Sequence, residues 1–180
     1  NGVTLTYNII DQANRHVEVT AQQNSYSLTP PTLAFPEAVY KPGETEPYTI
    51  TKIAGAIFNG RWNGQYNHPG TITLIFPSSL ETIGHMAFAH AFGVKVVDLS
   101  KCTKLKELVE LNFHRGTISE LYLPEGIEII GRWVFDHNLL EKLIIPSTIK
   151  ILDGSSFDDN QNLKVVDMRK VPVVPNQNTG

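Results

Sequence analysis

Apolar and polar residues alternate over a short segment, and the same alternation returns at a fixed interval along the chain. Residues 118–135 read ISELYLPEGIEIIGRWVF, residues 140–157 read LEKLIIPSTIKILDGSSF, and residues 163–169 begin a third copy. Three pairs of landmarks share one offset: Pro124 and Pro146, Leu121 and Leu143, and Phe135 and Phe157. A fixed period of about this length is typical of proteins in which each unit buries its apolar face against adjacent units. The pattern therefore predicts a solenoid.

Each unit predicts one coil. Leu121 and Leu123 alternate with Glu120 and Tyr122, which is strand periodicity with one face turned inward. Pro124 cannot donate to a ladder, so it ends the strand, and a short apolar return segment leads to a large aromatic anchor. We expect one parallel sheet formed by residues 73–76, 96–99, 120–123, 142–145 and 165–168. We also expect six side chains to be fully buried: Leu121, Leu123, Phe135, Leu143, Ile145 and Phe157.

Earlier copies follow the same spacing with insertions. Residues 74–88 (LIFPSSLETIGHMAF) keep every landmark, and residues 96–113 carry two extra residues. A first, stretched copy begins at residue 33, so the repeats are expected over residues 33–169, with insertions at residues 37–49 and 59–70.

These spacings give the pattern strand-Pro-xx-[LI]-xx-I-G-xxx-F, which resembles the BspA-like leucine-rich repeat family. The motif is carried by Leu74, Phe76, Pro77, Leu80, Ile83, Gly84, Ala87 and Phe88 and by their equivalents in later units. The resemblance implies a leucine-rich-repeat solenoid that is mainly β, from a secreted or surface protein of a bacterium. Where this family often places Cys, three residues after the Phe, the sequence has Asn138 and Asn160 in two units, which we expect to cap buried backbone groups in the turn.

The two ends lack the repeat. Residues 3–9 and 16–20 alternate strictly and flank a turn-forming segment, which predicts that residues 1–32 form a β-hairpin cap over the first coil. Residues 170–180 are expected to form a C-terminal cap or tail, in which Pro172 and Pro175 discourage pairing with another strand. No signal-like segment begins the sequence, so we expect that a targeting peptide has been removed or omitted.

Composition narrows the functional classes. A chain of 180 residues with 41% hydrophobic content suits one domain, and a net charge of −3 favours neither nucleic acid nor an anionic membrane as a partner. No apolar run is long enough for a membrane span. Cys102 is alone, so neither a disulfide framework nor a Cys-rich metal site is expected.

Motifs of catalysis and cofactor binding are missing from the sequence, including HExxH, GxSxG and glycine-rich phosphate loops. We therefore expect no enzymatic activity, no cofactor and no metal. One polar column follows the anchor positions: His90, Arg115, His137 and Asp159. An exposed turn column is favoured over a metal site because the two histidines are two coils apart. Asp158, Asp159 and Asn160 suggest calcium only weakly.

The remaining candidate is the surface of the sheet. Its outward positions include apolar residues, which either reflect β-propensity alone or form a protein-binding patch rimmed by charge. The predicted partner-binding residues are Ile75, Asp98, Glu120, Tyr122, Lys142, Ile144 and Asp167, with Trp62 and Tyr66 contributing from the second insertion. The two loop aromatics could instead cover the first coil.

The favoured function is a non-enzymatic, adhesion-type binding module. Its expected partner is a host extracellular or neighbouring-cell surface protein, and a glycan remains open. The alternative is a structural spacer that presents another domain and has no ligand of its own.

Overall fold

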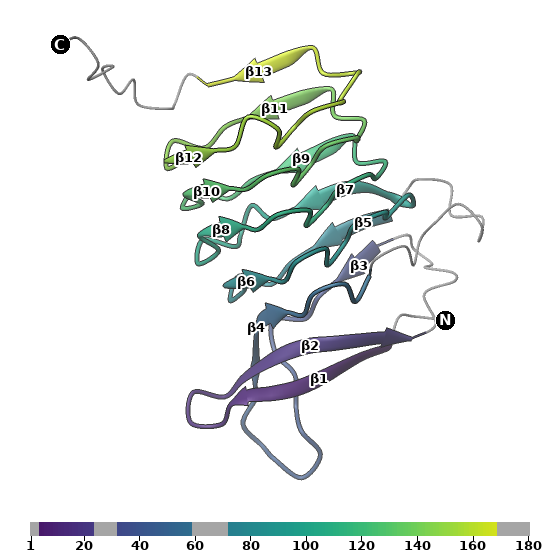
Figure 1. Cartoon of the computed structure of the whole chain (residues 1–180). Helices are drawn as coiled ribbons and strands as arrows, with labels where there is room; N and C mark the ends of the chain where they lie inside the picture. Colours follow the sequence, from purple (N-terminus) through teal and green to yellow (C-terminus); the bar gives the residue numbers. More distant parts are fainter. Residues whose placement is uncertain (1–3, 24–31, 59–71, 169–180) are drawn as a thin grey trace, which may run out of the picture.

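The computed structural model describes residues 4–23, 32–58 and 72–168, which form a stack of β-coils (Figure 1). Within these ranges, no helix has the length and apolar character needed to cross a membrane. The strands are β1 (Thr4–Asp11), β2 (His16–Gln23), β3 (Thr32–Ala34), β4 (Thr49–Ile53), β5 (Ile72–Ile75), β6 (Thr82–Ile83), β7 (Val94–Asp98), β8 (Glu107–Leu108), β9 (Glu120–Tyr122), β10 (Ile129–Ile130), β11 (Lys142–Ile144), β12 (Ile151–Leu152) and β13 (Val165–Asp167).

Each coil runs along one side of the stack and returns along the other (Figure 1). On one side, termed the front side, β3, β5, β7 and β9 pair in parallel. Their inward residues Leu33, Leu74, Val97 and Leu121 are in register. On the return side, β8, β10 and β12 also pair in parallel. The predicted parallel solenoid is confirmed, and its return segments are short strands.

The front sheet is interrupted between β9 and β11. β11 pairs with β13 but not with β9, so a four-stranded sheet is followed by a separate two-stranded one. The prediction of one continuous sheet is therefore wrong at this junction. The alternation of apolar and polar residues determines which side chains point inward. Whether two neighbouring strands pair through hydrogen bonds depends on the backbone path of both coils.

A ladder of phenylalanine rings runs through the core. The centroids of Phe58, Phe88, Phe113, Phe135 and Phe157 are 4.8, 5.2, 5.2 and 5.4 Å apart, and neighbouring rings are nearly parallel. The spacing is close to the separation of adjacent strands because each coil contributes one ring. Phe135 is completely buried, as the sequence predicts.

The other burial predictions have mixed outcomes. Leu143 and Ile145 are buried as expected. Leu121, Leu123 and Phe157 are only half-buried, so the prediction of full burial is wrong for them. The two leucines lie where the front sheet opens, and Phe157 belongs to the last complete coil, on which only the partial coil of β13 packs within the described residues.

The N-terminal end of the stack is closed by a hairpin. β1 and β2 pair antiparallel, and β2 continues in parallel with β4, placing Val17 opposite Ile50. Val17 and Val19 are buried against the first coil. The predicted β-hairpin cap is therefore confirmed over residues 4–23, and residues 1–3 and 24–31 of the predicted cap lie outside the described residues.

The first insertion is held against this hairpin. Val39 and Tyr48 form an antiparallel bridge, and the Arg15 guanidinium lies 4.1 Å from the centroid of the Tyr48 ring. Glu44 accepts from Lys41 and Arg15, both at 2.8 Å, and from the Tyr48 hydroxyl at 3.0 Å. These bonds, that of Lys41 first, lower the pKa of Glu44 to about 2.

At the opposite end, inward positions are exposed. Val166 and Met168 are 51% and 50% exposed, whereas Leu143 and Ile145, one coil earlier, are 3% and 1% exposed. Leu152 on the return side is also exposed. The described coils are therefore covered at one end and open at the other.

Candidate functional site

The outward residues of β5, β7, β9, β11 and β13 form the strand face. Ile75, Asp98 and Tyr122 are in register across three strands, and Ile144 is in register with Asp167 on the next pair. Tyr122 is 51% exposed and Ile144 is 49% exposed, while the other three side chains are half-buried. The apolar residues at the centre of the predicted site thus offer the most accessible area in this row.

A groove of about 400 Å³ opens in the strand face between β9 and β11. This β9–β11 groove is lined by Lys95, Ser119, Glu120, Leu121, Tyr122, Glu141, Lys142 and Ile144. A parallel ladder would pair the backbone of Leu121 with Lys142 and Ile144, but no ladder joins these strands in the described residues. The groove is therefore bordered by two strands that do not pair, and its lining combines the apolar Leu121, Tyr122 and Ile144 with charged side chains.

The neighbouring junctions show how the strands close elsewhere. Leu99 donates its backbone N–H to the Tyr122 carbonyl at 2.9 Å, and Ile145 donates to the Asp167 carbonyl at 3.0 Å. Leu123 occupies the equivalent position at the end of β9, and among the described residues no such bond connects it to β11. The β9–β11 junction thus lacks a backbone hydrogen bond that the neighbouring junctions have.

The two coils on either side of the groove remain joined away from the strand face. β10 and β12 pair on the return side, and the rings of Phe135 and Phe157 stack 5.4 Å apart. At the approach to β11, Leu139 donates to the Ile118 carbonyl at 2.9 Å. The opening is therefore local, and packing behind it holds the groove in place.

The charged residues around the groove are balanced in sign. Lys95 and Lys142 are matched by Glu120 and Glu141. The Lys95 ammonium lies 3.3 Å from the Glu120 carboxylate, and Lys164 lies 3.9 Å from Glu141. Such exposed pairs contribute little stability. The groove consequently does not select a strongly charged ligand.

The structure brings together only part of the predicted site. Glu120, Tyr122, Lys142 and Ile144 meet at the β9–β11 groove. Ile75, Asp98 and Asp167 lie elsewhere on the strand face, and the Asp98 carboxylate accepts bonds from the backbone and hydroxyl of Ser100 at 3.0 and 2.6 Å. Trp62 and Tyr66 lie outside the described residues.

Four groove residues were missed by sequence reasoning: Lys95, Ser119, Leu121 and Glu141. Lys95, Ser119 and Glu141 each precede a predicted strand by one residue. Extending every predicted strand backwards by one position would have found these three. Leu121 was assigned wholly to the core, and no sequence signal indicates that its coil opens.

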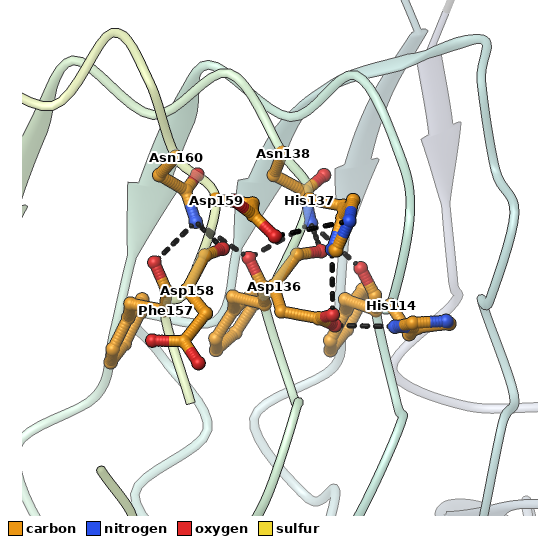
Figure 2. A network of polar contacts seen from close by, with 10 residues as sticks. His114, Asp136, His137, Asn138, Phe157, Asp158, Asp159 and Asn160 are labelled. Carbon is orange, nitrogen blue, oxygen red and sulfur yellow. Dashed lines mark hydrogen bonds and ion pairs between the residues drawn. The ribbon is translucent and has the colours of Figure 1, made fainter. Parts of the chain in front are cut away.

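A second polar cluster joins the turns of three coils (Figure 2). The buried Asp136 carboxylate bonds Nδ1 of His114 with one oxygen and Nδ1 of His137 with the other, the latter at 2.9 Å. Nε2 of His137 lies 3.1 Å from the Asp159 carboxylate. Because the partners belong to successive coils, this cluster links the coils at their turns.

The polar column predicted from the sequence has a backbone explanation. His90, Arg115, His137 and Asp159 all have positive φ, between 50° and 57°. They therefore mark one left-handed turn position repeated in each coil. No group of three His, Cys, Asp or Glu side chains among the described residues has a geometry that could hold a metal ion.

Asparagine side chains satisfy the backbone beside this column. Asn138 donates its amide to the carbonyls of Phe113 and Phe135 at 2.9 and 3.1 Å, and its Oδ1 accepts from the Ile118 N–H at 3.1 Å. Asn160 repeats the arrangement one coil later (Figure 2). The predicted capping role of both asparagines is confirmed.

Regularly repeated coils, parallel front strands, a phenylalanine ladder and asparagine-capped turns define a leucine-rich-repeat solenoid. The family described as "BspA type Leucine rich repeat region" matches this sequence over residues 47–164, in six copies of its repeat. The chain therefore belongs to the BspA-type leucine-rich repeat family.

Solved structures with similar folds are bacterial leucine-rich repeat proteins. A leucine-rich repeat protein of T. pallidum aligns with a TM-score of 0.70 and 19% identity over 90% of this chain and 67% of its own. One from Bacteroides ovatus aligns with a TM-score of 0.71 and 20% identity, covering 91% of this chain and 39% of that protein. A search of curated proteins finds no match to this sequence. At these identities the likeness shows the fold alone.

Proposed function

We propose that this chain is a non-enzymatic module that binds a protein partner through its strand face, with the β9–β11 groove at the centre. The observation that carries the proposal is the opening itself. Tyr122 and Ile144, each about half exposed, line the same groove as the half-buried Leu121.

The chemistry of the groove suits a protein surface. A large aromatic ring beside a branched aliphatic side chain offers area that can be desolvated with little loss of side-chain entropy. The surrounding Glu120, Lys142 and Glu141 are expected to set orientation and association rate more than affinity. A partner loop that presents one large apolar side chain between polar residues of both signs would fit this arrangement.

The proposal includes a setting for the module. Membership of the BspA-type family supports placement at the surface of, or secreted from, a bacterium, with a host extracellular or neighbouring-cell protein as partner. Immunolabelling of intact cells that produce the native protein tests the surface location.

The test of binding begins with a pull-down from host extracellular material and continues with variants. The double variant Tyr122→Ala, Ile144→Ser should weaken binding of the captured protein by at least about 2 kcal/mol. Both side chains point away from the core, so the thermal midpoint should change little. Ile151→Ser is a matched control, because it changes another exposed isoleucine, 56% accessible, on the return side of the stack.

Three outcomes separate the alternatives. Loss of binding in the double variant but not in the control supports the proposed site. Binding that survives the double change but is lost on replacing Trp62 and Tyr66 would assign the site to the second insertion. Failure to capture any partner that depends on the strand face would favour the spacer function.

A further inference from the structure

The hairpin cap ends in a strand with an open edge. β1 is the outermost strand of the sheet ordered β1-β2-β4-β6, and in the described residues only β2 pairs with it. It is eight residues long and contains no Pro, Lys or Arg, the residues that usually protect an edge strand from pairing. Its register with β2 shifts after Thr6 and again after Ile9, so the regular part of the edge is short.

A groove of about 630 Å³ runs beside this edge. It is lined by residues 5–9, which are consecutive in β1. Successive strand residues point to opposite faces, so a groove that touches all five reaches the edge of the strand. It is also lined by Val17 of β2, by Tyr48, and by Val39, Tyr40 and Pro42 of the first insertion, so it extends from the edge onto part of the hairpin face.

The lining of this cap groove is mostly apolar, and its charged residue is already paired. Tyr40 is 66% exposed and Ile9 is 36% exposed. Among the described lining residues only Lys41 is charged; it binds Glu44 at 2.8 Å, and Glu44 also binds Arg15. These lining residues therefore offer a charged ligand no unpaired counter-ion. An uncharged segment with apolar side chains suits the groove better.

We propose that the cap groove binds an extended, uncharged polypeptide segment of a partner protein, which adds to β1 as a further strand. The free edge of β1 would supply backbone hydrogen bonds, and the groove would take every second side chain of the segment. Two features of the same element, its open edge and the apolar groove beside it, select this occupant. The site is separate from the strand face and independent of the function proposed above.

The probe for this test is a capped seven-residue peptide in which Thr and Val alternate, flanked by Lys for solubility. Two further peptides carry backbone N-methyl groups on either the odd or the even residues. In a strand that adds to β1 in one direction with Val turned to the groove, one set of N–H groups faces β1 and the other faces solvent, because successive N–H groups point to opposite edges. Binding to the 180-residue chain is measured by fluorescence polarisation.

Strand addition predicts saturable binding of the parent peptide. One methylated peptide should bind at least about tenfold more weakly, and the other should bind within about twofold of the parent. Tyr40→Ala should weaken binding and leave the fold intact, since its ring is mostly exposed. Tyr122→Ala, on the strand face, should have no effect. Asn8→Pro should also abolish binding, provided that its circular dichroism spectrum is unchanged.

Three results would overturn the proposal. The first is that no peptide binds saturably. The second is that both methylated peptides lose affinity equally, which would indicate non-specific apolar adsorption. The third is a concentration-dependent dimer, seen by light scattering and disrupted by Tyr40→Ala, which would assign the edge to a second copy of the chain.

Discussion

Asn160 donates its side-chain amide to the carbonyl oxygen of Phe135 at 2.9 Å, although the two residues are 25 positions apart. The bond crosses from one coil to the previous one directly beside the aromatic ladder (Figure 2). The same amide also reaches the Phe157 carbonyl of its own coil at 2.9 Å. Each asparagine therefore fastens two successive coils at the point where the chain turns.

Replacing Asn138, which caps the turn one coil before Asn160, should destabilise the fold. Asn138→Ala leaves the buried carbonyl of Phe113 and the buried N–H of Ile118 without their side-chain partner. An unpaired buried polar group costs about 1–3 kcal/mol, so the free energy of unfolding should fall by roughly 2–4 kcal/mol in urea titrations. Asn162→Ala is the control, because Asn162 is exposed. Equal stability of the two variants would contradict the capping role.

The aromatic ladder should lose stability unevenly along its length. Phe135→Ala removes a ring that is stacked on both sides and completely buried, and should cost about 3–5 kcal/mol. Phe157→Ala should cost clearly less, because Phe157 is half-buried and the described structure shows one stacked neighbour for it. Denaturant unfolding of both variants measures the difference. A larger loss at Phe157 would mean that the last coil is better covered than the described residues show.

Two glycines should respond in opposite ways to Ala. A Cβ at Gly84 would lie 2.4 Å from the backbone nitrogen of Gly55 in the preceding coil, whereas a Cβ at Gly154 would meet nothing within 4 Å. Gly84→Ala should therefore push the two coils apart and lower stability by about 1–3 kcal/mol. Gly154→Ala should be neutral or raise stability by up to about 1 kcal/mol through the unfolded chain. Differential scanning calorimetry compares the two variants, and a destabilised Gly154→Ala would contradict the open space around this turn.

Stability should depend on pH through His90. Burial, followed by the charges of His114 and Arg115, lowers the pKa of His90 below its usual value near 6.5. The unfolded chain then binds the proton more readily, so this contribution to stability is present above about pH 6.5 and is lost as the pH falls through the folded-state pKa. His90→Asn tolerates the positive φ of 57° and removes the effect. Urea titrations from pH 7.5 to 5 should show a shallower loss of stability in the variant, and parallel curves would exclude the contribution.

The repeat itself was predictable because it depends on local spacing. One Pro and one Phe at fixed positions of each regular unit indicate the coil, its strand and its aromatic anchor, and the Asn three residues after the Phe indicates the turn cap. The hairpin cap was equally clear, since strict alternation on both sides of a turn-forming segment has few other interpretations.

The groove was not predictable in the same way. Tyr122 and Ile144 were correctly placed as outward neighbours, but alternation along β9 contains no information on whether its backbone closes onto β11. Asp136 was missed for a related reason. It stands directly after the anchor Phe135, where a polar residue is typical of an exposed turn, and its histidine partner His114 comes from the preceding coil.

The difference between the two ends of the stack gives unfolding a direction. In a solenoid each coil is stabilised mainly by its neighbours, so a coil covered on one side melts before a coil covered on both. Val166 and Met168 lie on the outermost described coil, while the hairpin covers the first. Amide hydrogens of β13 and β12 should therefore exchange first, those of β11 and β10 next, and those near Ile50 and Leu74 last. The described coils would then lose their structure one after another, from the coil of β13 towards the hairpin.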